Sequence, residues 1–414
     1  MNANAVNMYL EKHANYPAWI GCPANDDLSI VLVIPCYNEP DIRSTLDSLA
    51  QCRFEGFQVE VLVVVNQSED ESDIVRKTNE NSLATLKEWS SFHPTFALHS
   101  IFLKDVPAKK AGVGYARKTG MDEAVRRLQQ SRHKDKIILC LDADTLVQSN
   151  YVESVHTYFA EHPKCPAASI HYAHPLDDPS EEVNKAILEY ELHLRYYVLA
   201  QRWSGLKYAH QTVGSAMAVR MEDYVKQGGM NTRKAGEDFY FIHKFTHHIE
   251  FGNIMDTTVI PSARVSDRVP FGTGRAMMSI LSNEESLDTY APQSFAAIKK
   301  LVEQLPQLYQ GDYVLKNSEV MAVFLRNYQF PKKVEEIRSN TSDYHSFQKR
   351  FFQWFDAFLC MKYLHFARDG YYPNIPIYEA SDWLNKTYLG ANKSMHELEL
   401  LTKFRKYKNT FINE

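Results

Sequence analysis

Short apolar runs of strand length alternate with helical patterns over the first two thirds of the chain. The apolar runs lie at 28–35, 59–65, 96–103 and 136–141, and helical patterns lie at 41–52, 72–89 and 114–130. Because these runs are apolar at both alternating positions, they are typical of parallel strands that helices cover on both faces. The predicted fold class is therefore α/β, with a doubly wound, mostly parallel, Rossmann-like sheet that binds ligands beyond the carboxyl ends of its strands.

The pattern continues less regularly and then becomes helical. We expect strands at 167–172, 214–220 and 257–261 and helices at 180–203 and 237–247. From about Met277 glycine becomes scarce, and the aromatic segment Phe351 to Phe366 is typical of an amphipathic core helix. These shifts predict an N-terminal extension at 1–27, a catalytic α/β domain at 28–275 and a helical C-terminal domain at 276–414.

Composition narrows the class of protein without naming a function. The 414 residues are 44% hydrophobic and 23% charged with a formal charge of −5, which is ordinary for a globular protein and gives no sign of nucleic-acid binding. The six cysteines are scattered singly, which favours reduced, buried thiols. We see no transmembrane segment and no secretion signal, so we expect a cytoplasmic protein, with peripheral attachment to the inner membrane face left open.

The strongest chemical feature is Asp142-Ala143-Asp144, which follows the apolar run IILCL. Two carboxylates at the carboxyl end of a strand can share one hard cation, and oxygen ligands select Mg²⁺ or Mn²⁺. Such a cation stabilises a nucleoside diphosphate as a leaving group. Taken alone, these residues are better explained as a solvated loop after a strand, and the neighbouring loops change that interpretation.

Two more polar loops are expected at the same edge of the sheet. The first strand ends in Pro35-Cys36-Tyr37-Asn38-Glu39, and the second ends at Asn66. Tyr37 can stack on a base, and Asn38 and Glu39 can bond a ribose or base edge, although a plain turn with a helix cap is the alternative. Three strand ends thus converge where a nucleotide is expected.

Together these residues resemble the family 2 nucleotide-sugar glycosyltransferases of the GT-A fold. The resemblance rests on VIPCYNE at 33–39, the basic stretch 109–120 and LDAD at 141–144, and it covers about residues 28–275. It implies that Pro35, Tyr37, Glu39 and Asn66 line the nucleoside pocket and that Asp142 and Asp144 form the Asp-x-Asp motif. The second loop departs from the family pattern, because Asn66-Gln67-Ser68 replaces the usual Asp-rich sequence.

A basic, glycine-containing stretch begins the third predicted helix. Lys109, Lys110 and Arg117 surround Gly112 and Gly114. Backbone N–H groups and basic side chains at a helix start favour phosphate, while a basic helix start with turn glycines is the plain alternative. In similar proteins this segment approaches the nucleotide sugar, so Lys110 and Arg117 are candidates for binding it.

Two segments further along complete the resemblance. Gly236-Glu237-Asp238 opens a helix, and the resemblance implies a carboxylate beside the acceptor there. We predict Asp238 as the general base, with Glu237 beside it. Gly214 and Ser215 correspond to small residues beneath the acceptor.

The loop 264–275 contains three arginines and two glycines. We interpret it as a lid in which Arg268 contacts the departing diphosphate, and pairing of these arginines with surface acids is weighed equally.

The sequence therefore predicts a metal-dependent glycosyltransferase that moves a sugar from a nucleotide diphosphate sugar to an acceptor hydroxyl with inversion. A retaining transferase that resembles the mannosylglycerate or glucosyl-phosphoglycerate synthases, with Asp238 orienting substrate, is the first alternative. A non-catalytic nucleotide- or glycan-binding protein is the second. The acceptor, whether glycan, lipid-linked or small molecule, is open.

Overall fold

The computed structural model describes residues 3–14, 16–92, 95–247, 250–265, 272–282, 286–312 and 314–407. These residues form two compact units. The first contains Met1–Pro179 and Thr212–Ser279, and the second contains Ser180–Gln211 and Ile280–Tyr407. Each unit is described by itself below.

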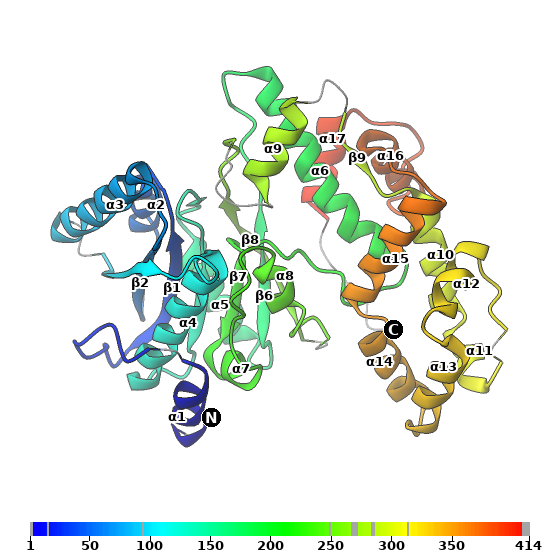
Figure 1. Cartoon of the computed structure of the whole chain (residues 1–414), viewed down its shortest axis with the longest axis horizontal. Coiled ribbons are helices and arrows are strands. Elements are labelled where there is room, and N and C mark those ends of the chain that lie inside the picture. Colours follow the sequence, from blue (N-terminus) through cyan, green and yellow to red (C-terminus); the bar gives the residue numbers. More distant parts are fainter. Residues whose placement is uncertain are drawn as a thin grey trace. The chain divides into compact units, whose positions relative to one another are not determined.

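The first unit is built on an eight-stranded sheet with the order β3-β2-β1-β4-β7-β6-β8-β5 (Figure 1). The strands are β1 (Leu28–Cys36), β2 (Gln58–Ser68), β3 (Ala97–Val106), β4 (Ile137–Cys140), β5 (Leu146–Val147), β6 (Ala167–Tyr172), β7 (Met217–Arg220) and β8 (Gly252–Ile260). The neighbours β3, β2, β1 and β4 are parallel. Beyond them β7 runs antiparallel to both β4 and β6, and β5 runs antiparallel to β8. The α/β prediction is confirmed, although the second half of the sheet is mixed rather than parallel.

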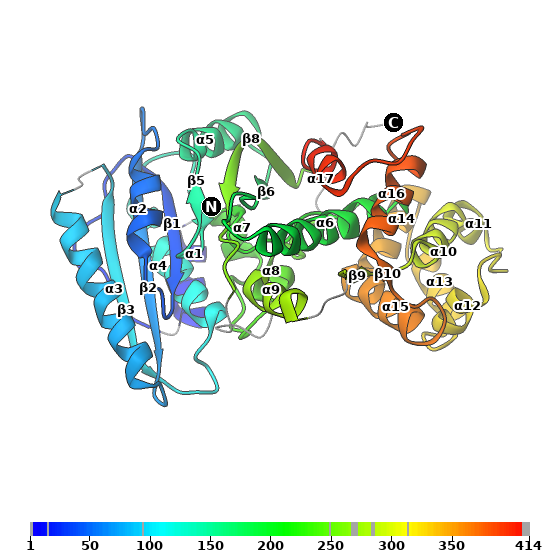
Figure 2. The same cartoon turned by 90° about the horizontal axis from the view of Figure 1, so that it is seen from above.

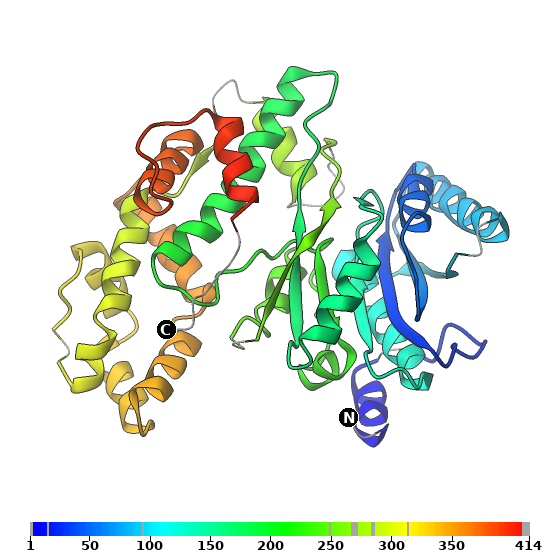
Figure 3. The same cartoon turned by 180° about the vertical axis from the view of Figure 1, so that it is seen from behind.

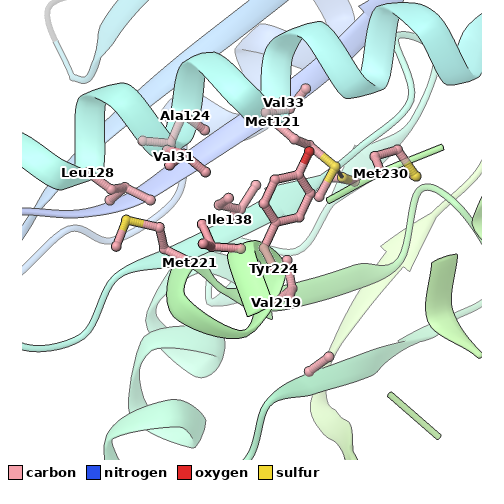
Figure 4. Close-up of a cluster of buried hydrophobic side chains, with 14 of the residues drawn as sticks. Val31, Val33, Met121, Ala124, Leu128, Ile138, Val219, Met221, Tyr224 and Met230 are labelled. Carbon is pink, nitrogen blue, oxygen red and sulfur yellow. Dashed lines mark hydrogen bonds between the residues drawn. The ribbon is translucent and has the colours of Figure 1, made fainter. Parts of the chain in front are cut away.

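Helices cover the sheet and bury its apolar strands. The helices of this unit are α1 (Ala3–His13), α2 (Ile42–Ala50), α3 (Asp73–Phe92), α4 (Val113–Gln130), α5 (Tyr151–Glu161), α7 (Met221–Lys226) and α8 (Glu237–Ile242). All nine residues of β1 and all four of β4 are buried, as the continuous apolar runs predict. Figure 4 shows Met121, Ala124 and Leu128 of α4 over the strand residues Val31 and Ile138. Burying each large apolar side chain contributes about 1.5–3 kcal/mol.

The second unit is helical. It contains α6 (Glu181–Trp203), α10 (Pro292–Glu303), α11 (Leu305–Gln310), α12 (Glu319–Arg326), α13 (Phe330–Ser339), α14 (Tyr344–Trp354), α15 (Ala357–Gly370), α16 (Ile377–Thr387) and α17 (Glu397–Arg405), with the short pair β9 (Asp288–Thr289) and β10 (Ile375–Pro376). Helix α9 (Thr273–Ser282) begins in the first unit. The long α6 packs with α10, α16 and α17, and Figures 2 and 3 show α17 beside α6. The predicted boundary at residue 275 stays a prediction, while α6 itself groups with the C-terminal helices.

Three local predictions differ from the structure. The aromatic segment 351–366 forms parts of two helices, because the Asp356 side chain accepts a hydrogen bond from the Leu359 N–H at 2.8 Å and starts α15 anew. Helix α8 ends at Ile242, five residues before the predicted end, where i→i+3 bonds at Lys244 and Phe245 tighten the chain. Cys22 is exposed, whereas the other five cysteines are buried, and none of the six forms a disulfide.

Among the described residues, none of the helices combines the length and the apolar character that a membrane crossing requires.

Candidate active site

Three parallel neighbours end at one edge of the sheet, since β1 ends at Cys36, β2 at Ser68 and β4 at Cys140. Pro35 lies within β1 opposite Val64. Beyond β1 the chain turns at Asn38, whose φ of 48° is left-handed, and its N–H donates to Asn79 Oδ1 at 3.0 Å. The Tyr37 hydroxyl donates to Glu71 Oε1 at 3.2 Å. Tyr37, Asn38 and Glu39 therefore lie between β1 and α2, while Pro35 lies in the last part of β1 itself.

Asn66 lies near the carboxyl end of β2 and is 4% exposed. Its Nδ2 donates to the Gly112 carbonyl at 3.4 Å. Its Oδ1 is buried and has no hydrogen-bond partner among the described residues. A buried acceptor without a partner costs about 1–3 kcal/mol, so this atom is a natural place for a ligand N–H.

Arg117 joins the two acidic motifs. It lies on α4, is 2% exposed, and donates from Nη2 to Asp142 Oδ1 at 2.6 Å and from Nη1 to Glu237 Oε1. Asp142 follows β4, while Glu237 is the first residue of α8. One buried guanidinium thus holds together carboxylates that are almost a hundred residues apart in sequence.

Gly214 lies against the same group. A Cβ placed on Gly214 would be 2.7 Å from Arg117 Nη1 and 3.0 Å from Asp238 Oδ2, which is too close for either contact. A side chain at position 214 would therefore require the Arg117 guanidinium and the Asp238 carboxylate to shift. Ser215 beside it is 1% exposed.

The electrostatics of this cluster are strongly perturbed. Burial raises the pKa of both Glu237 and Asp238, and the positive charge of Arg117 opposes that shift only in part. For Arg117 itself burial favours a lower pKa, but Glu237 and Asp142 outweigh burial and raise the pKa of the guanidinium. The arginine stays charged, while the two adjacent acids titrate at a higher pH than ordinary carboxylic acids.

A second arginine binds the other carboxylates. Arg264 donates from Nη1 to Glu39 Oε1 at 3.0 Å and from Nη2 to Glu39 Oε2 and, at 2.9 Å, to Asp144 Oδ2. Glu39 is 2% exposed and also accepts from the Asp41 N–H. Burial of Arg264 favours a lower pKa, but its hydrogen bond to Glu39 and the charge of Asp144 raise it. Each aspartate of Asp142-Ala143-Asp144 thus has an arginine partner.

This geometry agrees with a comparison to known families. Residues 31–223 match the family model described as Glycosyl transferase family 2. The chain contains a glycosyl transferase family 2 domain. That match confirms the family and the enzyme class, a glycosyltransferase, predicted from the sequence.

The solved structures that this chain resembles are distant. S. aureus TarS residues 1–349 in complex with UDP-GlcNAc is 14% identical with a TM-score of 0.42, over 79% of this chain and 92% of that one. The mannosyltransferase PcManGT from Pyrobaculum calidifontis in complex with GDP-Man and Mn²⁺ is 14% identical with a TM-score of 0.37, over 86% of this chain and 96% of that one. At these TM-scores the likeness identifies neither a nucleotide sugar nor an acceptor. No curated protein matches the chain.

The first unit brings several of the predicted site residues together. Arg117, Asp142, Glu237, Asp238 and Gly214 form one contact cluster. Lys110 instead lies exposed in the turn before α4. Arg268 lies outside the described residues.

Sequence reasoning missed two features of the candidate site. It singled out Arg268 in the lid and gave no specific partner to Arg264, although Arg264 is the arginine that contacts Asp144. It also placed Glu39 on the nucleoside, whereas Glu39 pairs with Arg264. No sequence signal identifies this pair, because the burial of Glu39, which requires a charged partner, is visible only in the structure.

Proposed function

We propose that the chain transfers a sugar from a nucleotide diphosphate sugar to an acceptor hydroxyl with inversion of the anomeric configuration. The observation that supports this most directly is the Arg117 bridge, with Asp142 on one side and Glu237 on the other. It holds the Asp-x-Asp motif, where the diphosphate is expected, beside the carboxylates expected at the acceptor. The diphosphate that leaves and the acceptor hydroxyl that attacks would then lie in one site, as a direct displacement requires.

Asp238 is the proposed general base. Its carboxylate accepts from the Phe239 N–H at 2.7 Å and is half-buried beside Gly214. An inverting transfer needs a carboxylate that takes the proton of the acceptor hydroxyl as its oxygen attacks. Because burial raises the pKa of Asp238, the ionised form is a stronger base than an ordinary aspartate. Glu237 is tied to Arg117 and therefore serves to position it.

The nucleoside is proposed to lie over the loops after β1 and β2. The buried Oδ1 of Asn66 is proposed to accept a hydrogen bond from a base N–H. Tyr37 lies in the neighbouring loop, and its side chain is partly exposed. Uracil N3–H and guanine N1–H both offer such a donor, so both nucleotides fit this requirement. Pro35, Asn38 and Glu39 complete the proposed nucleoside-binding side, and Lys110 and Arg268 are proposed to contact the nucleotide sugar from flanking segments.

Asp142 and Asp144 are proposed to hold a divalent cation, Mn²⁺ or Mg²⁺. Their side chains are 42% and 24% exposed, and both offer the carboxylate oxygens that these hard cations prefer. The residues therefore fit the ion, although Arg117 and Arg264 compete with it for the same oxygens. When bound, the cation neutralises the diphosphate and stabilises it as a leaving group.

The acceptor is proposed to approach Asp238 beside Gly214 and Ser215, where a side chain at position 214 would crowd the Asp238 carboxylate. Its identity, as glycan, lipid-linked sugar or small molecule, is open. A cytoplasmic site of action is part of the proposal, supported by six cysteines that form no disulfide, of which five are buried.

The stereochemistry of the product tests the proposal. After a nucleotide sugar and an acceptor that turn over have been identified, proton NMR of the first product formed reports its anomeric configuration. Inversion relative to the nucleotide sugar is expected. Retention would contradict the role of Asp238 as a base and support the alternative in which Asp238 only orients substrate.

A further inference from the structure

A second cluster of metal-ligand side chains lies at the other end of β4. His133 and Asp135 come directly before this strand, and His156 lies on α5. One ligand atom from each residue can be chosen so that all three lie within 4.8 Å of one another. Asp142 follows the same strand, so the cluster lies at the opposite edge of the sheet from the proposed active site.

Two atoms of the cluster lack hydrogen-bond partners among the described residues. Asp135 has a side chain that is 9% exposed, and its buried Oδ2 has no hydrogen-bond partner among the described residues. His156 Nε2 is also buried without a partner, although its ring stacks on Phe57 with centroids 3.9 Å apart. Buried polar atoms nearly always have hydrogen bonds, so two buried atoms without one in the same cluster favour a ligand at this place.

The surroundings already orient two of the three side chains. Asp135 Oδ1 accepts from Arg220 Nη1 at 3.0 Å, which fixes the carboxylate and leaves Oδ2 available. His133 Nδ1 lies 2.9 Å from the Asp135 carbonyl oxygen and 3.1 Å from the Asp135 backbone nitrogen, so it donates to the carbonyl in one tautomer and accepts from the N–H in the other. The tautomer that donates Nδ1–H to this carbonyl leaves the lone pair of Nε2 for a ligand. Donation of the second ring N–H to a backbone carbonyl is the usual arrangement of a metal-binding histidine.

We propose that His133, Asp135 and His156 bind one divalent transition-metal ion of the zinc class. Two imidazoles and one carboxylate form a donor set typical of zinc, and the fourth position is left for water because both histidines are partly exposed. The ion links the segment before β4 to α5. The site has no part in the proposed transfer reaction, and its role is to hold these two elements together.

Two features limit the affinity of this site. Bonds of about 2.0 Å in a tetrahedral site place ligand atoms roughly 3.3 Å apart, so the histidine rings must rotate to close the remaining gap. The positive charge of Arg220, and of Lys134 with its Nζ 3.9 Å from Asp135 Oδ2, also opposes a cation. We therefore expect zinc binding that a chelator reverses.

Zinc binding to the full chain tests the proposal. The Asp144→Asn variant serves as the parent, so that the proposed active-site cation contributes little, and zinc is measured by mass spectrometry after dialysis and by chelator competition. We expect about one zinc ion per parent chain. Since loss of an outer partner of a zinc ligand already weakens binding 10–100-fold, His156→Gln and His133→Gln should each weaken it by at least about a hundredfold.

His162→Gln is the matched control, because His162 is an exposed histidine at the end of the same helix and outside the cluster. It should bind zinc as the parent does. Circular dichroism checks that each variant is folded, and the two histidine variants lie on separate segments, so one serves if the other misfolds. Failure of the parent to bind zinc, or equal affinity in a folded His156→Gln or His133→Gln chain, would overturn the proposal.

Discussion

At the scale of single residues, the site depends on carboxylates whose neighbours set their charge. Asp238 has a raised pKa because of burial, with only partial opposition from Arg117. As a base it must be ionised, so transfer should fall as the pH drops through this raised pKa and recover as the pH rises. A pH profile of kcat should show this limb at a higher pH than the ordinary value for aspartate.

Asp238→Asn keeps the shape of the side chain and removes the base. We expect kcat to fall by about a hundredfold or more, with loss of the acidic limb of the pH profile. Asp256→Asn is the control, because Asp256 is exposed on β8, and it should leave the profile unchanged. Nearly full activity of Asp238→Asn would show that another group removes the proton.

Arg264 and a cation compete for Asp144. Because Arg264 Nη2 lies 2.9 Å from Asp144 Oδ2, its removal should strengthen Mn²⁺ binding in the absence of a nucleotide sugar. We expect Arg264→Gln to lower the Kd for Mn²⁺ by about threefold to tenfold, measured by electron paramagnetic resonance, where tenfold equals about 1.4 kcal/mol. Arg275→Gln, an exposed arginine beside Met278, should not change it. Weaker binding in Arg264→Gln would mean that Arg264 supports the cation site.

At the scale of elements, the site forms where the segment before β7 comes close to helices α4 and α8. The segment before β7 passes Arg117 of α4 and Asp238 of α8 without a side chain at Gly214. Helix α2 holds the Asp-x-Asp loop in turn, because Thr45 Oγ1 donates to the Ala143 carbonyl at 2.8 Å. The positions of the acidic side chains are thus fixed by their neighbouring elements.

Gly214→Ala tests this arrangement. The added methyl group would lie 2.7 Å from Arg117 Nη1, so the bridge between Asp142 and Glu237 must shift. We expect a loss of about 1–3 kcal/mol in the free energy of unfolding, measured by denaturant titration, together with a large fall in kcat. Gly21→Ala, with no atom within 4 Å of the added carbon, should change neither quantity. An active Gly214→Ala enzyme would show that the contact is not needed.

At the scale of the whole molecule, the sequence predicts the local elements better than the distant contacts. The alternation of buried strands and helices through β4 follows from periodicity, and the Asp-x-Asp motif is visible because its two carboxylates are adjacent. The pairing of Glu39 with Arg264 is not visible, since 225 residues separate them. Asp356 is an N-cap residue that indicates the start of a new helix at α15, but the continuous aromatic pattern around it favours one uninterrupted helix.

The grouping of α6 with the C-terminal helices was also beyond sequence reasoning. Buried Glu191 on α6 accepts from Arg195 on the same helix and from Arg405 on α17. A charged residue on a helix is ordinarily expected to face water, so only the fold reveals that these charges pair inside the second unit.

The central claim is that this chain transfers a sugar from a nucleotide sugar with the help of a cation on Asp142 and Asp144. The most direct test is a panel of nucleotide sugars with Mn²⁺ or Mg²⁺, followed by nucleoside diphosphate release, using the chain, Asp144→Ala and Asp238→Asn. We predict release from one nucleotide sugar that EDTA abolishes, that added metal restores, and that both variants lose. Metal-independent release, or no binding and no turnover with any nucleotide sugar, would contradict the account, and the latter would favour a non-catalytic binding protein.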